Sequence, residues 1–513
     1  IVGLTYRSFG DITIGSNWDP KVNFPNIGTT IGRSGYEYFS GNLKTQVSLA
    51  ENQTFTLTAQ YSRIPTVARQ DGIIQGYGSN VASVELGFSP QGRLFVLGEY
   101  KATFKNTWLD ELRFQLGYQQ VQDDRFQRNF STRPSFPNYS LGVTSSNTSL
   151  ESNISNLIGV TSVAKSTWGN NRFTYGVESY FDKVNAARNI RNDVTGTTPD
   201  PNGSRYVDGS TFNQYGVFVQ DEILWTPQFN TTLGIRYSAV DVNVPFSAIR
   251  PGTSGFKTSF SAVTASASFL YRFIPEAELV FNIGQGFRAP NINDLAAVGE
   301  RRASDINIPN PSLNPEKVFS VDGGLKWNAA NFSGEFYGFW SNYSDRINSV
   351  SIGQQVNSDG SISQLLQTRN VAKLTIWGIE FGSRYRFAPE LSAFVTGNFT
   401  YGEFPIFNET SIPPFNGVIG VRYEPNPGTY IEPYLRYATL QARLSDLDLT
   451  DRRINPNGTP GFGILNIRAG LPISSNTTLR LNLNNLFNTS YREHATSIDG
   501  PGFGVNIGID AQF

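Results

Sequence analysis

Apolar and polar side chains alternate one by one along much of the chain. Over residues 503–513, every odd position is apolar or aromatic, and Gly, Asn, Asp or Gln stands between them. A repeat of two is typical of a β-strand whose two faces meet different surroundings. This length matches the roughly 9–11 residues that cross a bilayer as a tilted strand. Similar alternation recurs over 54–61, 232–239, 465–471 and 479–484.

Short turn signals separate these runs. Nine segments carry the Asn, Gly, Pro or charged residues of tight reversals: 51–53, 105–107, 169–171, 226–228, 275–276, 329–331, 389–390, 425–428 and 474–476. Longer polar stretches lie between them, such as 129–155, 185–211, 288–316, 347–370 and 444–459. Nine turns divide the chain into ten hairpins, which predicts about twenty antiparallel strands.

The polar faces of these strands indicate what kind of sheet they form. They carry Arg, Asn, Gln, Thr or Gly, which suit water better than a packed core. A soluble sandwich also alternates, but it rarely sustains such long strands over a whole chain of this size. We therefore predict an all-β fold, a large closed antiparallel transmembrane β-barrel of about 20–22 strands with short periplasmic turns and long extracellular loops. Closure is expected because an open edge in lipid leaves backbone groups unpaired.

Hydropathy and charge narrow the class further. Mean hydropathy is −0.29, and no run approaches the roughly 18 apolar residues of a transmembrane helix. Residues 1–7 lack a charged segment followed by an apolar one, so we expect no signal peptide. The formal net charge is −1, which argues against nucleic acid as a partner because phosphate binding needs a concentrated basic field.

Three rare residue types restrict the chemistry. With 0 Cys and 1 His, disulfides, thiolate catalysis and sites with two imidazoles are excluded. No pair of carboxylates stands out as a hydrolytic pair. We expect no enzyme activity, no metal and no cofactor. The chain also has 0 Met, which we interpret as a sign of an engineered or redesigned chain.

Several motifs resemble those of TonB-dependent outer-membrane receptors. Residues 286–291 read Gly-Phe-Arg-Ala-Pro-Asn and residues 309–316 read Pro-Asn-Pro-Ser-Leu-Asn-Pro-Glu, which together resemble the FRAP…NPxLxPE signature of that family. Asn-Leu-Phe-Asn at 485–488 resembles its penultimate strand pair, and Phe513 resembles its terminal aromatic residue. Other similar pieces lie at 175–178, 370–372, 378–380 and 458–468, and those at 89–93 and 448–451 resemble receptors of the Bacteroidetes type.

The resemblance implies an integral protein of the bacterial outer membrane. Barrels of this family have 22 strands and a lumen filled by an N-terminal plug domain, and a segment before the plug engages TonB. Nothing in 1–513 resembles the plug, so we expect a single barrel domain without it. Phe513 would then be the assembly signal for the barrel-assembly machinery.

The segment between the two halves of the signature supplies the candidate contact residues. The functional hypothesis assigns to a ligand-contact or gating loop Arg288, Asn291, Asp294, Glu300, Arg301 and Arg302. The alternative is that Pro290 and the Asn-Pro pairs only shape the loop, while its charges face water.

Four further basic residues have two interpretations each. Arg236, Arg468 and Arg480 alternate with apolar residues, and facing lipid would cost roughly 2–4 kcal/mol each. They should therefore point into the lumen, either to pair with acids or to tune ion selectivity. His494 is either a surface loop residue or an axial haem ligand.

These observations predict a wide, weakly selective passive pore for small solutes or ions, surrounded by outer-membrane lipid. One alternative is a receptor that imports a siderophore, haem, cobalamin or saccharide, with TonB as partner only if a plug exists elsewhere. A second alternative is a soluble all-β glycosidase or lectin, although the blade repeat of a propeller is not found.

Overall fold

The computed structural model describes most of the chain. The described residues are 1–17, 30–69, 84–105, 108–130, 144–192, 194–200, 203–246, 254–297, 299–302, 305–356, 362–371, 373–403, 411–451, 453–496 and 498–511.

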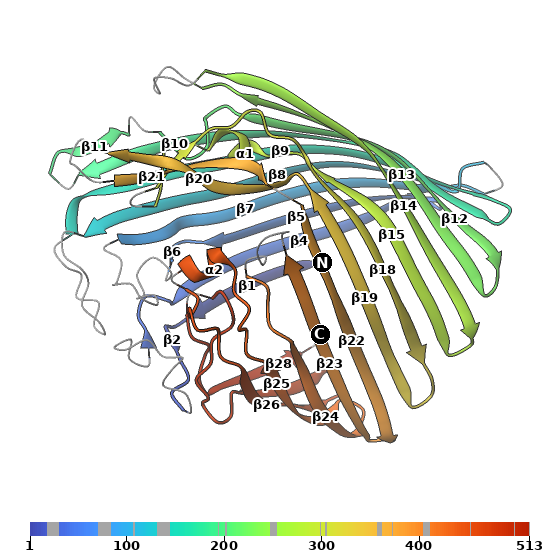
Figure 1. The fold of residues 1–513 in the computed structure, drawn as a ribbon. Coiled ribbons are helices and arrows are strands. Elements are labelled where there is room, and N and C mark those ends of the chain that lie inside the picture. The colour runs from blue at the N-terminus through green and yellow to red at the C-terminus, as the bar shows by residue number, and fades with distance from the viewer. Residues whose placement is uncertain are drawn as a thin grey trace.

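One curved antiparallel sheet forms the wall of the molecule (Figure 1). Among the described residues it contains 22 strands, of which two are short, β6 (Val67–Ala68) and β11 (Gly196–Pro199). The long strands are β1 (Val2–Phe9), β4 (Tyr36–Ala50), β5 (Gln53–Ile64), β7 (Val84–Thr103), β8 (Glu111–Phe130), β9 (Thr144–Trp168), β10 (Asn171–Asn192), β12 (Thr211–Thr226), β13 (Phe229–Val244), β14 (Phe256–Ile274), β15 (Ala277–Arg288), β18 (Glu316–Asn328), β19 (Phe332–Ser344), β22 (Leu374–Ala388), β23 (Leu391–Glu403), β24 (Asn416–Asn426), β25 (Thr429–Ala438), β26 (Phe462–Ser474), β27 (Thr477–Asn484) and β28 (Gly504–Ala511).

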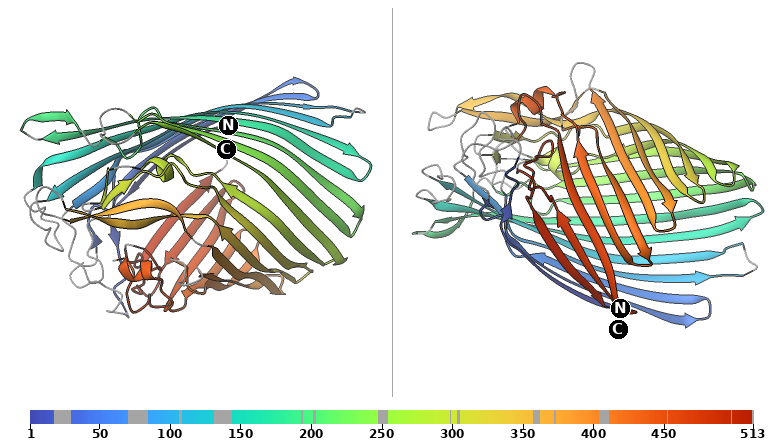
Figure 2. Two further views of the ribbon diagram at one scale, coloured as in Figure 1. Left: turned by 45° about the horizontal axis from the view of Figure 1, so that its top comes forward. Right: turned by 90° about the horizontal axis from the view of Figure 1, so that it is seen from below.

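Each long strand pairs antiparallel with the next long strand along the chain, from β1–β4 to β27–β28. Eight of the nine expected tight turns connect such pairs at one end, which we call the turn end, and the ninth, 105–107, lies partly outside the described residues. The long connections lie at the opposite loop end, and both chain termini lie toward the turn end (Figure 2). Eight of the predicted turns and the count of about twenty long strands are confirmed among the described residues.

The strands run further than the sequence pattern indicates. β9 enters the stretch 129–155, which alternation assigned to a loop, and β10 continues to Asn192. β20 (Arg346–Val356) and β21 (Ile362–Val371) occupy much of 347–370. Backbone pairing does not depend on side-chain alternation, so the strands can continue where both faces are polar and the alternation ends.

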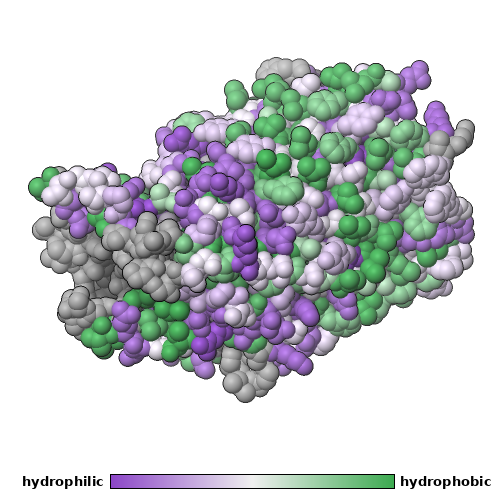
Figure 3. Space-filling model, turned by 90° about the horizontal axis from the view of Figure 1, so that it is seen from above, coloured by the Kyte–Doolittle hydropathy of each residue, from purple (hydrophilic) through white to green (hydrophobic). Residues whose placement is uncertain are grey.

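The two faces of the sheet differ as expected. On β13, Leu233, Ile235 and Tyr237 are 46–51% exposed on the outer face, while Arg236 and Ser238 lie on the inner face. Hydrophobic side chains gather over the strands between more polar ends (Figure 3). Large aromatic residues mark the turn end of this belt, with Trp108, Trp168 and Trp225 all more than half exposed.

A small hydrophobic core lies on the inner face near the loop end. The helix α1 (Ile292–Ala296) buries Ile292, Leu295 and Ala296. They pack with Val240, Val242 and Val244, which occupy the inner-face positions of β13. The loop after β15 therefore folds inward and rests on the wall.

The first and last strands meet differently from the others. No backbone ladder joins β1 to β28 in the part of the chain that the structure describes. At the loop end, residues 13–17 instead bond to the β27–β28 connection, through Gly15 N to Gly500 O (3.3 Å) and Gly502 N to Thr13 O (2.9 Å). We call this contact between residues 13–17 and 485–503 the seam clasp.

The remaining elements lie in loops. β2 (Ile12–Thr13) pairs with β3 (Thr30–Ile31), and α2 (Asp446–Thr450) lies between β25 and β26. β16 (Gly299–Arg302), β17 (Asp305–Ile308), β21 and β20 form a separate sheet at the loop end. No helix in the described ranges is long and apolar enough to cross a membrane.

Candidate functional site at the loop end

The loop that follows β15 begins with a helix cap. The Asn291 side chain accepts a hydrogen bond from Asp294 N (2.9 Å), and Asn291 N donates to Asp294 Oδ2 (3.0 Å). This reciprocal arrangement is a capping box, which satisfies two backbone donors at the start of α1. Pro290 is fully buried beside it. The Ala-Pro-Asn sequence thus turns the chain inward directly after the strand.

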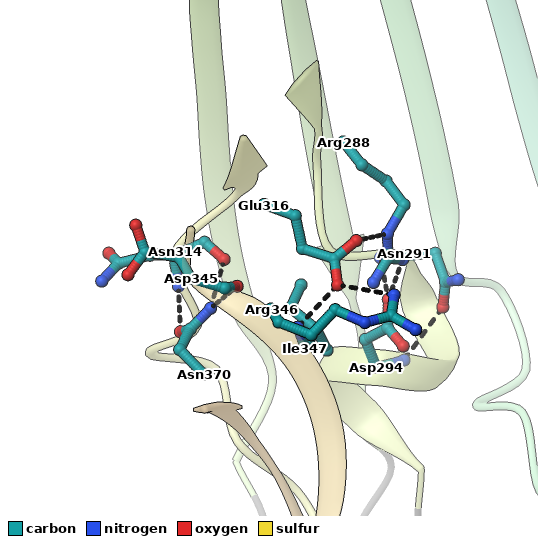
Figure 4. Close-up of polar contacts among 9 residues, drawn as sticks. All are labelled: Arg288, Asn291, Asp294, Asn314, Glu316, Asp345, Arg346, Ile347 and Asn370. Carbon is teal, nitrogen blue, oxygen red and sulfur yellow. Dashed lines mark hydrogen bonds and ion pairs between the residues drawn. The ribbon is translucent and has the colours of Figure 1, made fainter. Parts of the chain in front are cut away.

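Glu316 is the centre of an ionic network at this position. Its side chain is 6% exposed and forms an ion pair with Arg288, whose Nη1 also binds Asp294 Oδ2 at 2.7 Å. Glu316 Oε1 accepts from Ile347 N (2.6 Å) and from Arg346 Nη1 (3.3 Å). One carboxylate therefore connects the end of β15, the start of β18 and the start of β20 (Figure 4).

Asn370 joins the same two loops on the other side of the network. Its Oδ1 accepts from Asn314 N (2.8 Å), and its Nδ2 donates to Asn314 O (2.9 Å) and Asp345 O (2.7 Å). A short distance away, Asn310 Nδ2 donates to Thr368 O at 2.8 Å. The amide side chains thus connect the two loops through hydrogen bonds to backbone groups.

The small loop-end sheet completes this connection. β17 pairs in parallel with β21, so a strand of the β15–β18 loop lies beside a strand of the β19–β22 loop. α1 attaches one of these loops to the inner wall, and the ionic network attaches both loops to strand ends. We call the described residues of these two loops, within 289–315 and 345–373, the collar. Such a structure can narrow the mouth of a barrel and hold polar groups in a fixed position there.

The structure brings three of the six expected loop residues together, namely Arg288, Asn291 and Asp294. Arg288 bonds to the Asp294 and Glu316 carboxylates, and the Asn291 side chain accepts from the Asp294 backbone N–H, so each supports the loop conformation. The other three expected contact residues lie in β16, where their side chains fall outside the described part: Glu300, Arg301 and Arg302. Phe513 also lies outside the described residues.

The three strand arginines lie on the inner face, each beside a carboxylate. Arg236 forms an ion pair with Glu178 from β10. Arg468 Nη1 lies 3.5 Å from Glu432 Oε1. The Arg468 guanidinium also lies 4.4 Å from the centroid of the Tyr434 ring. The third, Arg480, has its Nε 2.5 Å from Asp510 Oδ2.

His494 lies in the seam clasp region and is half-buried. Its Nδ1 is 2.9 Å from Thr459 Oγ1, in the connection that precedes β26. Burial lowers the pKa of His494, and the nearby Asp448 and Asp451 oppose that shift. The ring therefore favours its neutral form and joins two loops.

A buried ion pair lies next to this histidine. Arg492 Nε is 2.7 Å from Asp499 Oδ1, and their side chains are 3% and 1% exposed. Burial raises the pKa of the Asp499 carboxyl, whereas Arg492 opposes the shift. The pair holds the β27–β28 connection in the shape that residues 13–17 bind.

Sequence reasoning placed Glu316 inside a motif but did not identify it as the hub, and it missed Arg346 and Asn370 as partners. Glu316 follows a proline directly after a polar loop, which is a weak signal for a fixed carboxylate. Nothing local to Arg346 or Asn370 reveals the contact, because their partners lie 30 and 56 residues away.

A sequence comparison matches residues 5–486 to the family described as TonB dependent receptor-like, beta-barrel. An uncharacterized TonB-dependent receptor of Haemophilus influenzae is 26% identical over 187 residues, which are 36% of this chain and 47% of that protein. The chain spans about half the length of this curated relative.

Solved structures show the same fold at low sequence identity. The copper transporter OprC superimposes with a TM-score of 0.79 at 16% identity, covering 100% of this chain and 76% of that one. The iron transporter FrpB of Neisseria meningitidis gives 0.73 at 16% identity, covering 100% and 76%. The Serratia marcescens hemophore receptor HasR, in complex with its hemophore and heme, gives 0.70 at 15% identity, covering 99% and 75%.

The family match extends over most of the barrel, from the first strand to the last tight hairpin and through both halves of the collar motif. The fold of the similar solved structures agrees with it. The chain belongs to the TonB-dependent receptor-like β-barrel family.

Proposed function

We propose that this chain forms the wall of a solute conduit in the bacterial outer membrane, and that the 513-residue barrel on its own conducts small solutes and ions passively. The observation that carries the proposal is the contrast between the two faces of one continuous sheet. The outer face is apolar and bordered by tryptophans, whereas the inner face carries arginines that are neutralised by carboxylates. A lumen of paired charges favours neither cations nor anions strongly.

The conduit requires that the sheet closes, with β1 and β28 on either side of the seam. The seam clasp supports closure because it joins the two ends of the sheet at the loop end through several backbone hydrogen bonds. An open edge in hydrocarbon would leave a row of backbone groups unpaired, at a cost of several kcal/mol for each group. Outer-membrane lipid and the barrel-assembly machinery are the partners that this proposal includes.

The collar sets the size of the mouth. Because α1 is packed on the wall and Glu316 joins three strand ends, we propose that the collar narrows the entrance permanently. Arg288, Asn291 and Asp294 then act by holding this shape, and any contact of the loop with solutes comes from residues further along it.

Planar-bilayer recording tests the conduit. The purified chain should give large single-channel currents that do not close with voltage and that depend little on the sign of the permeant ion. A chain that inserts but gives no current contradicts the passive pore. A chain that stays soluble without detergent contradicts the membrane barrel.

Energised import is a second candidate, favoured by the family match and by the named transporters and receptor among the similar structures. In that mode a plug occupies the lumen and TonB supplies the energy. Uptake that depends on TonB in cells, together with a closed channel in bilayers, would support this mode over the passive one.

A further inference from the structure

The neighbouring strands β14 and β15 part before either of them ends. Their backbone ladder begins beside the tight turn and, among the described residues, stops at the pair Ser266 and Gly284. β14 nevertheless continues to Phe256, paired with β13, and β15 continues to Arg288, paired with β18. The wall is therefore divided between β14 and β15 toward the loop end.

A hollow of about 410 Å³ lies at this division, lined by β14, β15, β18 and β19. Residues that face each other on paired strands lie on the same side of a sheet. Val263 pairs with Tyr237, which is exposed on the outer face. Gln285 alternates with Phe281, which is also exposed on that face, and pairs with Phe319. The hollow therefore opens on the outer face of the wall and not into the lumen.

The lining changes from apolar to polar side chains toward the loop end. On the side nearer the turn end, Val263 and Phe319 are 60% and 39% exposed. On the side nearer the loop end, the lining includes Ser261, Ser344 and Lys317. On the outer face of a membrane barrel, such a change marks the level at which hydrocarbon gives way to lipid headgroups.

Lys317 brings a positive charge to this level. It lies on the outer face of β18, where it pairs with Phe287 on one side and Ser344 on the other. In the part of the chain that the structure describes, no carboxylate forms an ion pair with Lys317, in contrast to the inner-face arginines. A lysine near a membrane surface attracts anionic lipid headgroups, and its long side chain can reach the headgroup level from an apolar surface.

The floor of the hollow is held in place from within the protein. Phe287 is partly buried and packs against the small hydrophobic core beside α1. The hollow is therefore formed in advance, which lowers the entropic cost of binding there. Its apolar part is continuous with the exposed hydrophobic side chains of the outer face, so a lipid chain can enter it directly from the surrounding bilayer.

We propose that this hollow is a subsite for one phosphate-bearing lipid of the surrounding outer leaflet. An acyl chain lies between β14 and β15 against Val263, Phe287 and Phe319, and the lipid phosphate pairs with the Lys317 ammonium group. The Ser344 hydroxyl lies at the same level and can donate to a remaining phosphate or ester oxygen. The inference rests on the proposed membrane location of the barrel and is independent of its conductance, because the subsite faces lipid.

Native mass spectrometry of the detergent-solubilised chain tests the subsite. Phosphatidylglycerol is the anionic probe, phosphatidylcholine with the same acyl chains is the zwitterionic one, and inorganic phosphate has no chain. One phosphatidylglycerol should stay bound in preference to phosphatidylcholine, and excess inorganic phosphate should not displace it. Lys317→Ala should weaken this binding roughly fivefold, the usual contribution of one lysine near a membrane surface. Val263→Trp should fill the hollow and abolish retention of both lipids, and the exposure of Val263 allows the larger side chain without disturbing the core.

The matched control is Lys257→Ala, which removes an exposed lysine on the outer face of the same strand as Val263, outside the hollow. It should leave lipid retention unchanged. Equal losses in the two lysine variants, equal retention of the two lipids, or displacement by inorganic phosphate would overturn the subsite. A dimer that Val263→Trp disperses, with no lipid bound to the parent chain, would assign the hollow to a second copy and also overturn it. A chain that retains no lipid but still gives bilayer currents would reject the subsite and leave the conduit standing, so the two failures are distinguishable.

Discussion

Glu316 is a buried carboxylate that holds several parts of the collar together. From the start of β18, it touches Arg288 at the end of β15, and Arg346 and the Ile347 amide at the start of β20. Its removal would take the acceptor from the Ile347 N–H and the pairing carboxylate from Arg346, while Arg288 would keep only Asp294. Because both arginines are partly exposed, water recovers part of the loss.

We therefore expect Glu316→Ala to loosen the collar by about 1–3 kcal/mol, the typical cost of leaving a buried hydrogen-bonding group unsatisfied. Hydrogen exchange should show faster exchange at Ile347 and across β20, while β18 and β19 below it stay protected. Glu493→Ala removes the exposed pair with Arg436 and is the matched control, expected to change little. Unchanged exchange in Glu316→Ala would contradict its role as the hub.

Protonation of His494 makes the stability of the seam clasp depend on pH. Burial lowers its folded-state pKa below the ordinary 6.5, so between these two values the unfolded chain binds the proton more readily. The stability contributed by the neutral ring is complete above pH 6.5 and is lost as pH falls toward the folded pKa. The thermal midpoint in detergent should therefore be lower at pH 5.5 than at pH 7.5, and His494→Gln should reduce this difference. An identical pH response in the variant would contradict the prediction.

At the scale of elements, side-chain alternation and turn residues predicted the strands and tight turns, which depend mainly on neighbouring residues. Alternation over 232–239 located β13 correctly, and residues such as Pro275 and Glu276 marked a tight turn, because side-chain period and turn chemistry need only near neighbours. The parallel pairing of β17 with β21 could not be predicted in this way. It joins segments about 60 residues apart and depends on α1 and Asn370 bringing the loops together.

α1 offers a test of the collar as a fixed element. Leu295 is fully buried against the inner wall, and replacing it with Asn removes apolar contact and inserts a polar group. The loss should be roughly 2–5 kcal/mol, enough to release a short helix from the wall. Single-channel conductance should rise, with more current noise, because the mouth widens and fluctuates. Asn293→Ser, on the exposed side of the same helix, should behave like the parent chain. Equal conductance in both variants would show that the collar does not limit the entrance.

At the scale of the whole molecule, the sequence predicted a barrel but not how its two ends meet. The first and last strands are separated by almost the entire chain, so no periodicity reports on their contact. The structure places the Asn-Leu-Phe-Asn motif in the seam clasp, with Asn485 and Asn488 both at positive φ (47° and 52°). Asn tolerates this conformation better than most residues, which explains why the motif carries it at both positions.

Asn488 is the residue through which the seam clasp can be tested. Its carbonyl accepts from Ser16 N (3.1 Å) and Asn17 N (3.0 Å), while its side chain accepts from Phe503 N (3.0 Å) and donates to Ser16 Oγ (2.9 Å). Asn488→Ala loses both side-chain bonds and strains the backbone, whereas Asn488→Gly loses the bonds but keeps the conformation. Asn488→Asp keeps the acceptor for Phe503.

If the clasp closes the barrel, the temperature at which the folded band is lost on SDS gels should fall most for Asn488→Ala, less for Asn488→Gly and least for Asn488→Asp. This order follows from the interactions that each variant retains, because a barrel opens in detergent at its weakest junction. Asn457→Ala, in an exposed turn before β26, is the control and should leave the temperature unchanged. A uniform response across the Asn488 variants would mean that the wall is held at the seam by other contacts, and that residues 13–17 only cover it.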